Sequence, residues 1–158
     1  LSRLSPYTGA SGMAVFNKLN GFVEHLAEGV HDLGSNQLVL ALSNVAPGSE
    51  STAPTSSTAA CLLANVTQVS YSNCSSRSVT TSSATQSSGT YRLTLADLTL
   101  SATGTVGPFR YIYLYNDTPT SPADPLIGYF DYGSALTLSN GESLTIDFDQ
   151  ASGALTLS

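Results

Sequence analysis

The chain has 158 residues, the usual size of one domain, and is long enough to bury a hydrophobic core without metals or disulfides. Hydrophobic residues make up 41% of it but charged residues only 10%, well below the roughly 25% of an average domain. The net charge of −6, with only 5 Lys and Arg, argues against nucleic acid and membrane surfaces as partners, because both bind clustered cations.

The N-terminal segment 1–12 is small and polar and precedes the only methionine, Met13. This segment lacks the apolar core of a signal peptide, and no run of roughly 18 apolar residues could span a bilayer. We therefore expect a chain that is neither exported nor embedded in a membrane. Leu1, Leu4 and Tyr7 are its only sizeable apolar residues, too few to fold alone. We expect this N-terminal arm to bind neighbouring subunits, since contacts must offset the entropy of ordering it.

Apolar residues then recur at spacings of three and four, which predicts an amphipathic helix over about 14–28. Its stripe, which we expect to pack on a sheet, contains Val15, Leu19, Phe22 and Leu26. Gly29 lies where the helix should end, because glycine tolerates the left-handed conformation of a C-terminal cap. Gly21 is a weak point inside the helix, costing about 1 kcal/mol against alanine.

The hydrophobic period changes after this helix. Residues 37–42 form a short apolar run that predicts a strand buried on both faces. Residues 47–60 are almost wholly Pro, Gly, Ser, Thr and Ala, which predicts a long surface loop. We expect this loop, like the N-terminal arm, to lie against neighbouring subunits. Further strands are predicted at 66–71, 79–81, 90–100, 110–115, 126–132, 135–138, 143–148 and 154–157. Short strands separated by turns, without helices between them, favour a mainly β fold, an antiparallel β-sandwich or jelly-roll-like domain over 13–158.

The C-terminal region contains two turn signals. Asn140-Gly141 lies between two alternating runs, which is the strongest short hairpin signal because both residues accept positive φ. It predicts a hairpin between the strands at 136 and 144. Residues 150–153 form the second turn, and together they predict a three-stranded C-terminal meander.

The chain offers few groups for catalysis. Cys61 and Cys74 lack zinc-site spacing, and free thiols are favoured over a disulfide. His25 and His31 are the only histidines, and no nucleophile motif accompanies them. We therefore expect no enzyme activity, no catalytic residues, no cofactor and no metal.

Two groups of side chains are alternatives to that expectation. One could bind a divalent ion at the helix end and contains His25, Glu28 and Asp32. A histidine near a helix C-terminus is favourable for dipole reasons alone, so solvated helix residues are the preferred interpretation. The other could hold calcium or perform acid–base chemistry and contains Asp131, Asp147 and Asp149. The solvent face of a sheet explains these carboxylates equally well and is preferred.

Tyr111, Tyr113 and Tyr115 alternate with Ile112 and Leu114, so one face of this strand carries tyrosines and the other aliphatic side chains. Such a face could stack on sugars. Packing or a subunit interface is preferred, because an apolar ring with a hydroxyl suits both.

Three segments carry a family resemblance. They are MAVFNKLNGFVEHLAEGVHDLGSNQLVLALSNVAP, SSGTYRLTLADLTLSATGTVGPFRYIYLYNDTPTSPADPLIGYFDYGSALTLSNGESLTIDF and ASGALTLS. These segments resemble a family of small proteins encoded in tailed-bacteriophage and prophage genomes. The resemblance runs from Met13 to the end, and the Ser/Thr/Cys-rich middle fits least well.

The resemblance implies a virion structural protein. The first expectation is a capsid decoration (cement) protein on the head exterior, made in the host cytoplasm, which binds the major capsid protein and copies of itself as a dimer or trimer. A tail or neck component is the nearest alternative, and a carbohydrate-binding receptor-recognition module is the competing class.

Overall fold

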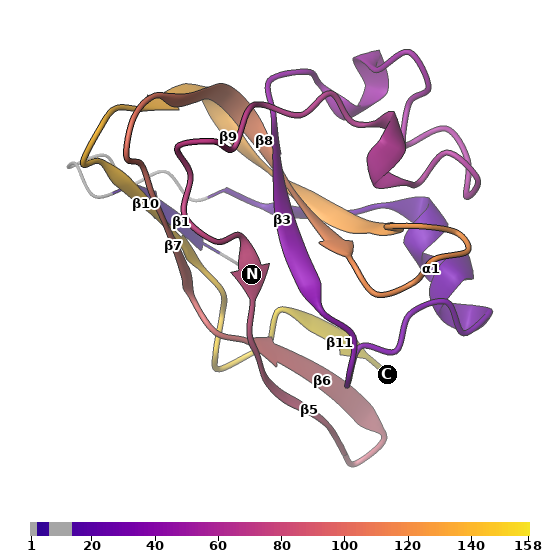
Figure 1. Cartoon of the computed structure of the whole chain (residues 1–158). Coiled ribbons are helices and arrows are strands. Elements are labelled where there is room, and N and C mark those ends of the chain that lie inside the picture. Colours follow the sequence, from indigo (N-terminus) through magenta and orange to yellow (C-terminus); the bar gives the residue numbers. More distant parts are fainter. Residues whose placement is uncertain (1–2, 7–13) are drawn as a thin grey trace.

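The structure of the chain, a computed structural model, describes residues 3–6 and 14–158 (Figure 1). These residues contain one α-helix, α1 (Asn20–Ala27), and two short 3₁₀ helices, η1 (Pro47–Ser49) and η2 (Leu63–Asn65). The strands are β1 (Arg3–Pro6), β2 (Phe16–Lys18), β3 (Leu38–Ser43), β4 (Ser78–Val79), β5 (Thr81–Ser87), β6 (Thr90–Leu95), β7 (Leu98–Ser101), β8 (Val106–Asn116), β9 (Leu126–Leu138), β10 (Ser143–Asp147) and β11 (Leu155–Leu157).

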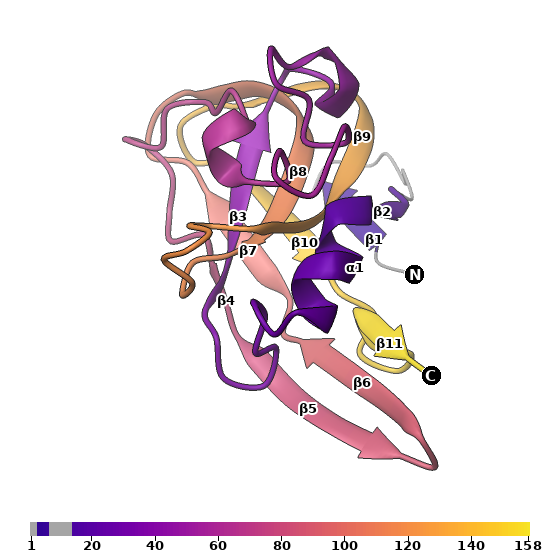
Figure 2. The ribbon, with the colours of Figure 1, turned by 90° about the vertical axis from the view of Figure 1, so that its right-hand side faces the viewer.

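The strands form three antiparallel sheets, with orders β1-β10-β7, β11-β6-β5 and β2-β9-β8-β3-β4. The two smaller sheets cover one face of the five-stranded sheet, which gives a sandwich-like arrangement (Figures 1 and 2). The prediction of a mainly β, antiparallel fold with one helix is therefore confirmed. None of the helices in residues 14–158 is long and apolar enough to cross a membrane.

The predicted C-terminal hairpin and meander are wrong. Asn140-Gly141 does form a turn, in which Gly141 has φ +85° and the Glu142 N–H donates to the Ser139 carbonyl at 3.0 Å. However, the turn joins two sheets: β9 pairs with β8, whereas β10 pairs with β1 and β7. The reason is burial, because crossing to the second layer brings the alternating apolar residues of β10 onto the open face of the large sheet.

The helix is shorter than predicted. The predicted first turns instead form β2, in which Phe16 stands opposite Phe130 on β9, with their ring centroids 5.0 Å apart. Strand pairing on a long neighbour gives these residues backbone partners that the first turn of an isolated helix lacks. Val15 consequently points to solvent and is 58% exposed, while Leu19 and Phe22 of the same stripe are buried. The predicted C-terminal end is confirmed within one residue, and Gly29 has φ +78°.

Most predicted strands are present, with four differences. The predicted strand 79–81 is the end of β4 and the start of β5, which belong to different sheets. Residues 66–71 form no strand and contribute one isolated bridge, between Gln68 and Ser43. The predicted strand 90–100 is two strands, β6 and β7, which belong to different sheets. The predicted strands at 126–132 and 135–138 are one continuous strand, β9, which runs through Gly133.

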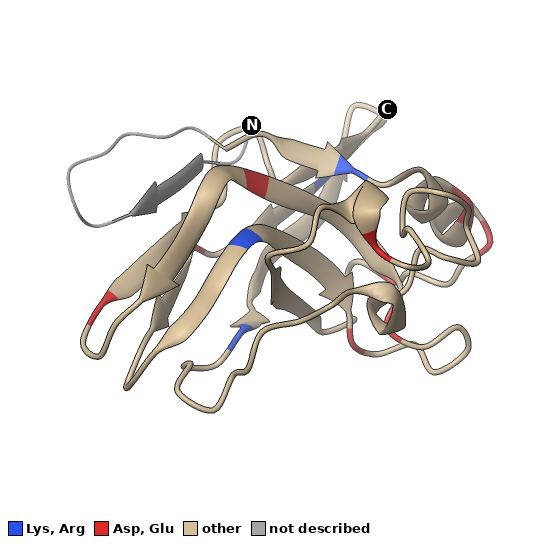
Figure 3. Cartoon of the chain, turned by 90° about the horizontal axis from the view of Figure 1, so that it is seen from above, with Lys and Arg blue, Asp and Glu red and all other residues tan. Residues whose placement is uncertain are grey.

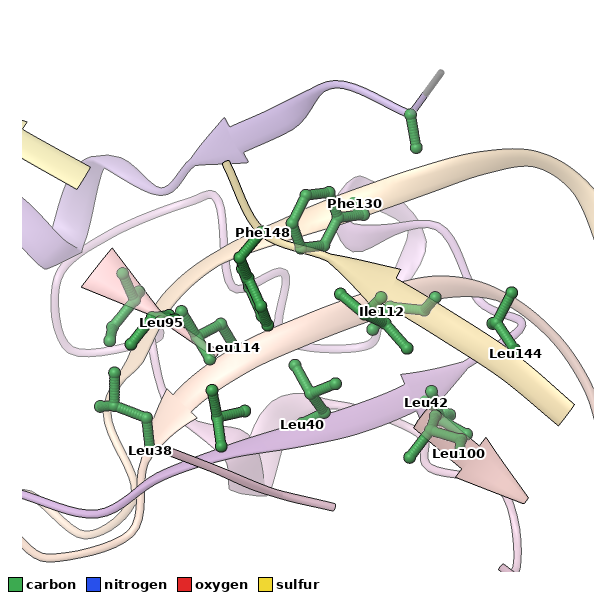
Figure 4. Close-up of a cluster of buried hydrophobic side chains, with 14 of the residues drawn as sticks. Leu38, Leu40, Leu42, Leu95, Leu100, Ile112, Leu114, Phe130, Leu144 and Phe148 are labelled. Atoms are coloured by element: carbon green, nitrogen blue, oxygen red, sulfur yellow. The ribbon is translucent and has the colours of Figure 1, made fainter. Parts of the chain in front are cut away.

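The main core lies between the layers. In Figure 4, the leucines of β3 and the aliphatic face of β8 are drawn with residues from the two smaller sheets. The labelled side chains are Leu38, Leu40, Leu42, Leu95, Leu100, Ile112, Leu114, Phe130, Leu144 and Phe148. All ten are buried. Because both layers must contribute to this core, the chain crosses between sheets where the sequence predicts a local hairpin.

The described part of the predicted N-terminal arm is β1. Arg3–Pro6 pairs antiparallel with β10, and Leu4 stands opposite Ile146. This segment therefore has backbone partners in its own chain, where it covers an edge that β10 would otherwise leave open. The predicted contact of the arm with neighbouring subunits stays a prediction. Leu1 and Tyr7 lie outside the described residues.

Candidate functional site

The tyrosine face of β8 is covered by its own chain. Tyr113 is 0% exposed, Tyr111 8% and Tyr115 5%, and they form a second buried cluster on the side of the large sheet that faces away from the main core. The other buried members are Leu19, Val39, Ala41, Cys61, Val66 and Leu126. This arrangement corresponds to the packing alternative. The predicted role of the three tyrosines in binding a partner is therefore corrected, because their rings are not accessible.

The tyrosines are covered by residues that flank the Ser/Thr-rich region 47–60, which sequence analysis predicts as a surface loop: Ala46 precedes it, and Cys61, Leu63 and Val66 follow it. We call residues 46–66 the covering segment. Its backbone is fixed to the chain at two points: Leu63 N–H donates to the Asp124 carbonyl, and Leu126 N–H to the Cys61 carbonyl, both at 3.0 Å. Thr58 also donates to the Glu24 carboxylate of α1 at 2.6 Å. Within residues 47–60, Thr58 thus contacts α1 of its own chain, and the expected contact of this range with neighbouring subunits stays a prediction.

Cys61 lies where the covering segment meets α1. A Cβ atom at Gly21 would stand 2.5 Å from Cys61 Cβ and 2.9 Å from Thr58 Cα, so only glycine permits this approach. Burial raises the pKa of the Cys61 thiol to about 11, which keeps it protonated and unreactive. Cys74 packs against the main core, on the other side of the sheet, and both thiols are free, as predicted.

One hydroxyl in the tyrosine cluster has no partner. Tyr113 Oη is buried without a hydrogen bond, and burial raises the pKa of this phenol strongly. Most buried hydroxyls find a partner, so this one is an energetic weakness of the loop-covered face.

A hollow of about 390 Å³ opens beside the C-terminal end of α1. It lies between the end of the helix, the following loop, the β5–β6 hairpin and the C-terminal strand β11. Its lining residues are Leu26, His31, Asp32, Leu33, Gly34, Ala84, Tyr91 and Leu157. The combination of apolar walls with one carboxylate, one phenol and one imidazole is typical of a site for a small polar ligand. Sequence analysis missed Tyr91, because its distance along the chain from Asp32 gave no signal of their proximity.

The imidazole of His31 is oriented by a fixed network. Thr118 N–H donates to Asn116 Oδ1, which settles the orientation of that amide. Asn116 Nδ2 then donates to Asn36 Oδ1 at 2.7 Å and lies 3.2 Å from His31 Nδ1. Because Nδ1 accepts from the amide, Nε2 carries the proton of the neutral ring. That Nε2 is buried and has no partner.

His31 and His25 form a buried pair, each 5% exposed, with ring centroids 6.0 Å apart. Burial and the neighbouring His25 lower the pKa of His31 to about 4. Both features favour a neutral His31 ring at pH 7. The alternative metal site of His25, Glu28 and Asp32 is not assembled: the described residues contain no group of three His, Cys, Asp or Glu side chains that could hold a metal ion.

The three carboxylates of the second alternative are also separate. Asp131 forms a two-point ion pair with Arg110, at 2.7 and 2.9 Å, which lowers the pKa of Asp131. Asp149 accepts from the backbone N–H groups of Ala151 and Ser152 in a turn. Asp147 lies on β10, in a different sheet from Asp131. These positions match the preferred interpretation of ordinary strand and turn carboxylates.

Charged groups are sparse on every described element, and the few basic residues are scattered over the sheets (Figure 3). Within residues 14–158, neither histidine has a hydrogen bond to a serine, threonine or cysteine. A nucleophile–base contact of that kind is what acyl transfer requires. In comparisons with known proteins, no family model, no curated protein and no solved structure matches this chain.

Proposed function

We propose that the chain is a non-enzymatic structural protein of a tailed-bacteriophage particle, a head decoration protein that binds the major capsid protein lattice. The observation that supports this proposal most is the distribution of its polar groups. Reactive side chains such as Cys61 and His31 are buried, whereas the accessible surface presents neutral Ser and Thr hydroxyls. Such a surface suits binding by shape and hydrogen bonds to a neighbouring protein.

The covering segment illustrates this surface. Its anchoring residues, such as Cys61 and Pro54, face inward, while Thr55, Ser56 and Ser57 are exposed. Anchoring at Thr58, Cys61 and Leu63 means that little further entropy is lost when a partner binds the exposed hydroxyls. A capsid lattice repeats one binding surface many times, so moderate affinity per copy is sufficient.

The proposal is tested with particles of a phage that encodes this chain, prepared without it. Purified chain added to them should bind saturably, at a copy number set by the head lattice, and should raise the temperature at which the heads open. A few copies confined to the neck or tail would support the alternative tail or neck component. No binding to any part of the particle would contradict the proposal.

A carbohydrate-binding, receptor-recognition role is the second candidate, and the hollow beside α1 favours it. Asp32 can accept from ring hydroxyls, and the half-buried ring of Tyr91 offers an apolar surface for a sugar. A glycan array tests this role. Binding that disappears in Tyr91→Ala but persists in Arg92→Ala, a change of the neighbouring exposed side chain, would establish it and displace the first proposal.

A further inference from the structure

The edges of the sheets differ in how far they are protected against pairing with another chain. An exposed strand edge presents unpaired N–H and C=O groups, and natural proteins cover such edges, shorten them, or interrupt them with proline, charge or bulges. Among the described strands, β2, β4 and β11 are edges of only two or three residues.

The longer edges near the core are covered. Beyond the short β4, the free side of β3 is closed by the segment before it: Leu40 N–H donates to the Arg77 carbonyl at 2.9 Å and Leu42 N–H to Tyr71 Oη at 2.9 Å. The Arg77 guanidinium donates to the Leu40 carbonyl and lies 3.6 Å from the centre of the Tyr71 ring. Ser75 covers the end of β7 in a similar way, through hydrogen bonds with Ser101.

The remaining long edges are interrupted. Where β8 extends beyond β3 it contains Pro108, which has no N–H to offer a partner strand. Where β9 extends beyond β2 it contains Gly133, with φ +91°, and the Gly133 N–H already donates to Asp131 Oδ1 at 2.8 Å. Both edges are therefore poor templates for an added strand.

β5 lacks these protections along most of its length, and its one irregularity lies at its start, between Thr81 and Ser83. It is the outer strand of the sheet β11-β6-β5 and pairs with β6 regularly from Ser83 to Ser87. No proline and no charged residue occurs in residues 78–91, and most side chains of β5 are exposed. The hairpin also projects away from the body of the molecule, so the edge is open to an approaching strand (Figure 2).

We propose that the free edge of β5 pairs antiparallel with β5 of a second copy of this chain across a two-fold axis. This inference does not rest on the proposed function, because it concerns the purified chain alone. The absence of charge supports a second copy as the partner, since a charge at or near the two-fold axis would lie close to its own equivalent and repel it.

The side chains of β5 fit this partner. Ala84 faces the hollow, so Ser83, Thr85 and Ser87 lie together on the other face of the strand. We place the two-fold axis at Thr85, so that Thr85 faces its own equivalent and Ser83 faces Ser87 of the second copy, and Thr and Ser are favourable cross-strand neighbours. The pairing joins two three-stranded sheets into one of six strands and leaves the two molecular bodies on either side of the axis.

The test uses the wild-type chain and Thr85→Lys in sedimentation equilibrium over a range of concentrations. We expect the wild type to dimerise and Thr85→Lys to dimerise at least about tenfold more weakly, because two like charges meet at the axis. Ala135→Lys adds the same charge at an exposed site on β9 and should dimerise like the wild type. An equal mixture of Thr85→Lys and Thr85→Glu should regain the dimer, because opposite charges then meet.

Three results would overturn the inference. If the wild type stays monomeric up to millimolar concentration, β5 does not pair with a second copy, and an extended segment of another protein becomes the alternative partner. A dimer that persists unchanged in Thr85→Lys, or one that Ala135→Lys weakens equally, would place the interface elsewhere. Circular dichroism of each variant checks that it is folded, and Thr85 is exposed, so none of these substitutions disturbs the core.

Discussion

The two faces of β8 are built from the same strand but are covered in different ways. Ile112 and Leu114 face two further sheets, whose regular strands supply interlocking aliphatic side chains. Tyr111, Tyr113 and Tyr115 face an irregular segment anchored by a few hydrogen bonds. Both faces exclude solvent almost completely, so regular secondary structure is not a condition for burial.

The difference lies in how each cover is held. Strands are fixed along their whole length by ladders, whereas the irregular cover depends on local contacts such as the close approach of Gly21 to Cys61. We therefore expect the strand-covered face to contribute most of the stability and the loop-covered face to open first.

The largest expected effect is on the strand-covered face. Phe130→Ala should lower the free energy of unfolding by about 3–5 kcal/mol, because this ring is fully buried between Phe16 and Phe148. Tyr129→Ala, the adjacent residue on the other face, removes a half-buried ring and should cost about 1–2 kcal/mol. Urea denaturation measures both values, and equal losses would break the comparison of the two faces.

The sequence predicts the layers of this fold better than its connections. Periodicity located β3, β8 and β10 closely, because burial imposes alternation or an apolar run on each strand. It could not assign strands to sheets: Asn140-Gly141 specifies a turn, but only the burial of β10 residues decides that the turn crosses between layers. The predicted start of the helix is wrong because Phe16 suits the apolar stripe of a helix and the buried face of a strand equally well, so the sequence pattern cannot distinguish them.

The candidate site was even less predictable. His31 was recognisable only as one of two histidines, because the amide of Asn116 that orients it lies far along the chain. Tyr91 was expected only as one residue of a strand. The alternation of the tyrosines is plain in the sequence, but the residues that cover them flank a Ser/Thr-rich region whose composition predicts exposure. Such a cover leaves no hydrophobic pattern to detect.

The second test concerns His31, which follows α1. The pKa of His31 is lowered to about 4, so the unfolded chain takes up a proton first as the pH falls below 6.5. The free energy of unfolding should therefore be highest above pH 6.5 and fall by up to about 3 kcal/mol between pH 6.5 and 4. Thermal unfolding across this range measures the loss.

His31→Asn is the control for this pH dependence, because an asparagine can still accept from Asn116 but does not titrate. The variant should lose most of the slope between pH 6.5 and 4, while the carboxylates titrate in both proteins. An unchanged slope would mean that other groups, and not His31, cause the loss of stability at low pH.

The third effect tests the anchor of the irregular cover. Gly21→Ala should cost about 1–3 kcal/mol, since the added methyl collides with Cys61 and Thr58, although alanine is the better helix former. Helix propensity alone predicts the opposite, that alanine at position 21 would stabilise the chain. Gly48→Ala, where a Cβ meets nothing within 4 Å, should change stability little. If Gly21→Ala stabilises the chain, the cover is not held at this contact.

The smallest effect is expected from single hydroxyls. Tyr113→Phe removes a buried hydroxyl without a partner and should leave the free energy of unfolding unchanged or raise it by up to about 1 kcal/mol. Tyr71→Phe should lower it by about 1 kcal/mol, because Tyr71 Oη accepts from the Leu42 N–H and donates to Gln68 Oε1. Equal losses in the two variants would mean that the Tyr113 hydroxyl is satisfied in solution.

The order of strands in the large sheet has a consequence for biosynthesis. β2 and β3 emerge early from the ribosome, but β3 pairs mainly with β8 and β2 only with β9, whose residues are translated much later. Until β8 appears, the buried leucines of β3 have no long strand to pair with, and β2 has no partner until β9 appears. Assembly of the layers must therefore follow translation of most of the chain, and the topology, dominated by distant pairings, should fold in milliseconds to seconds rather than microseconds.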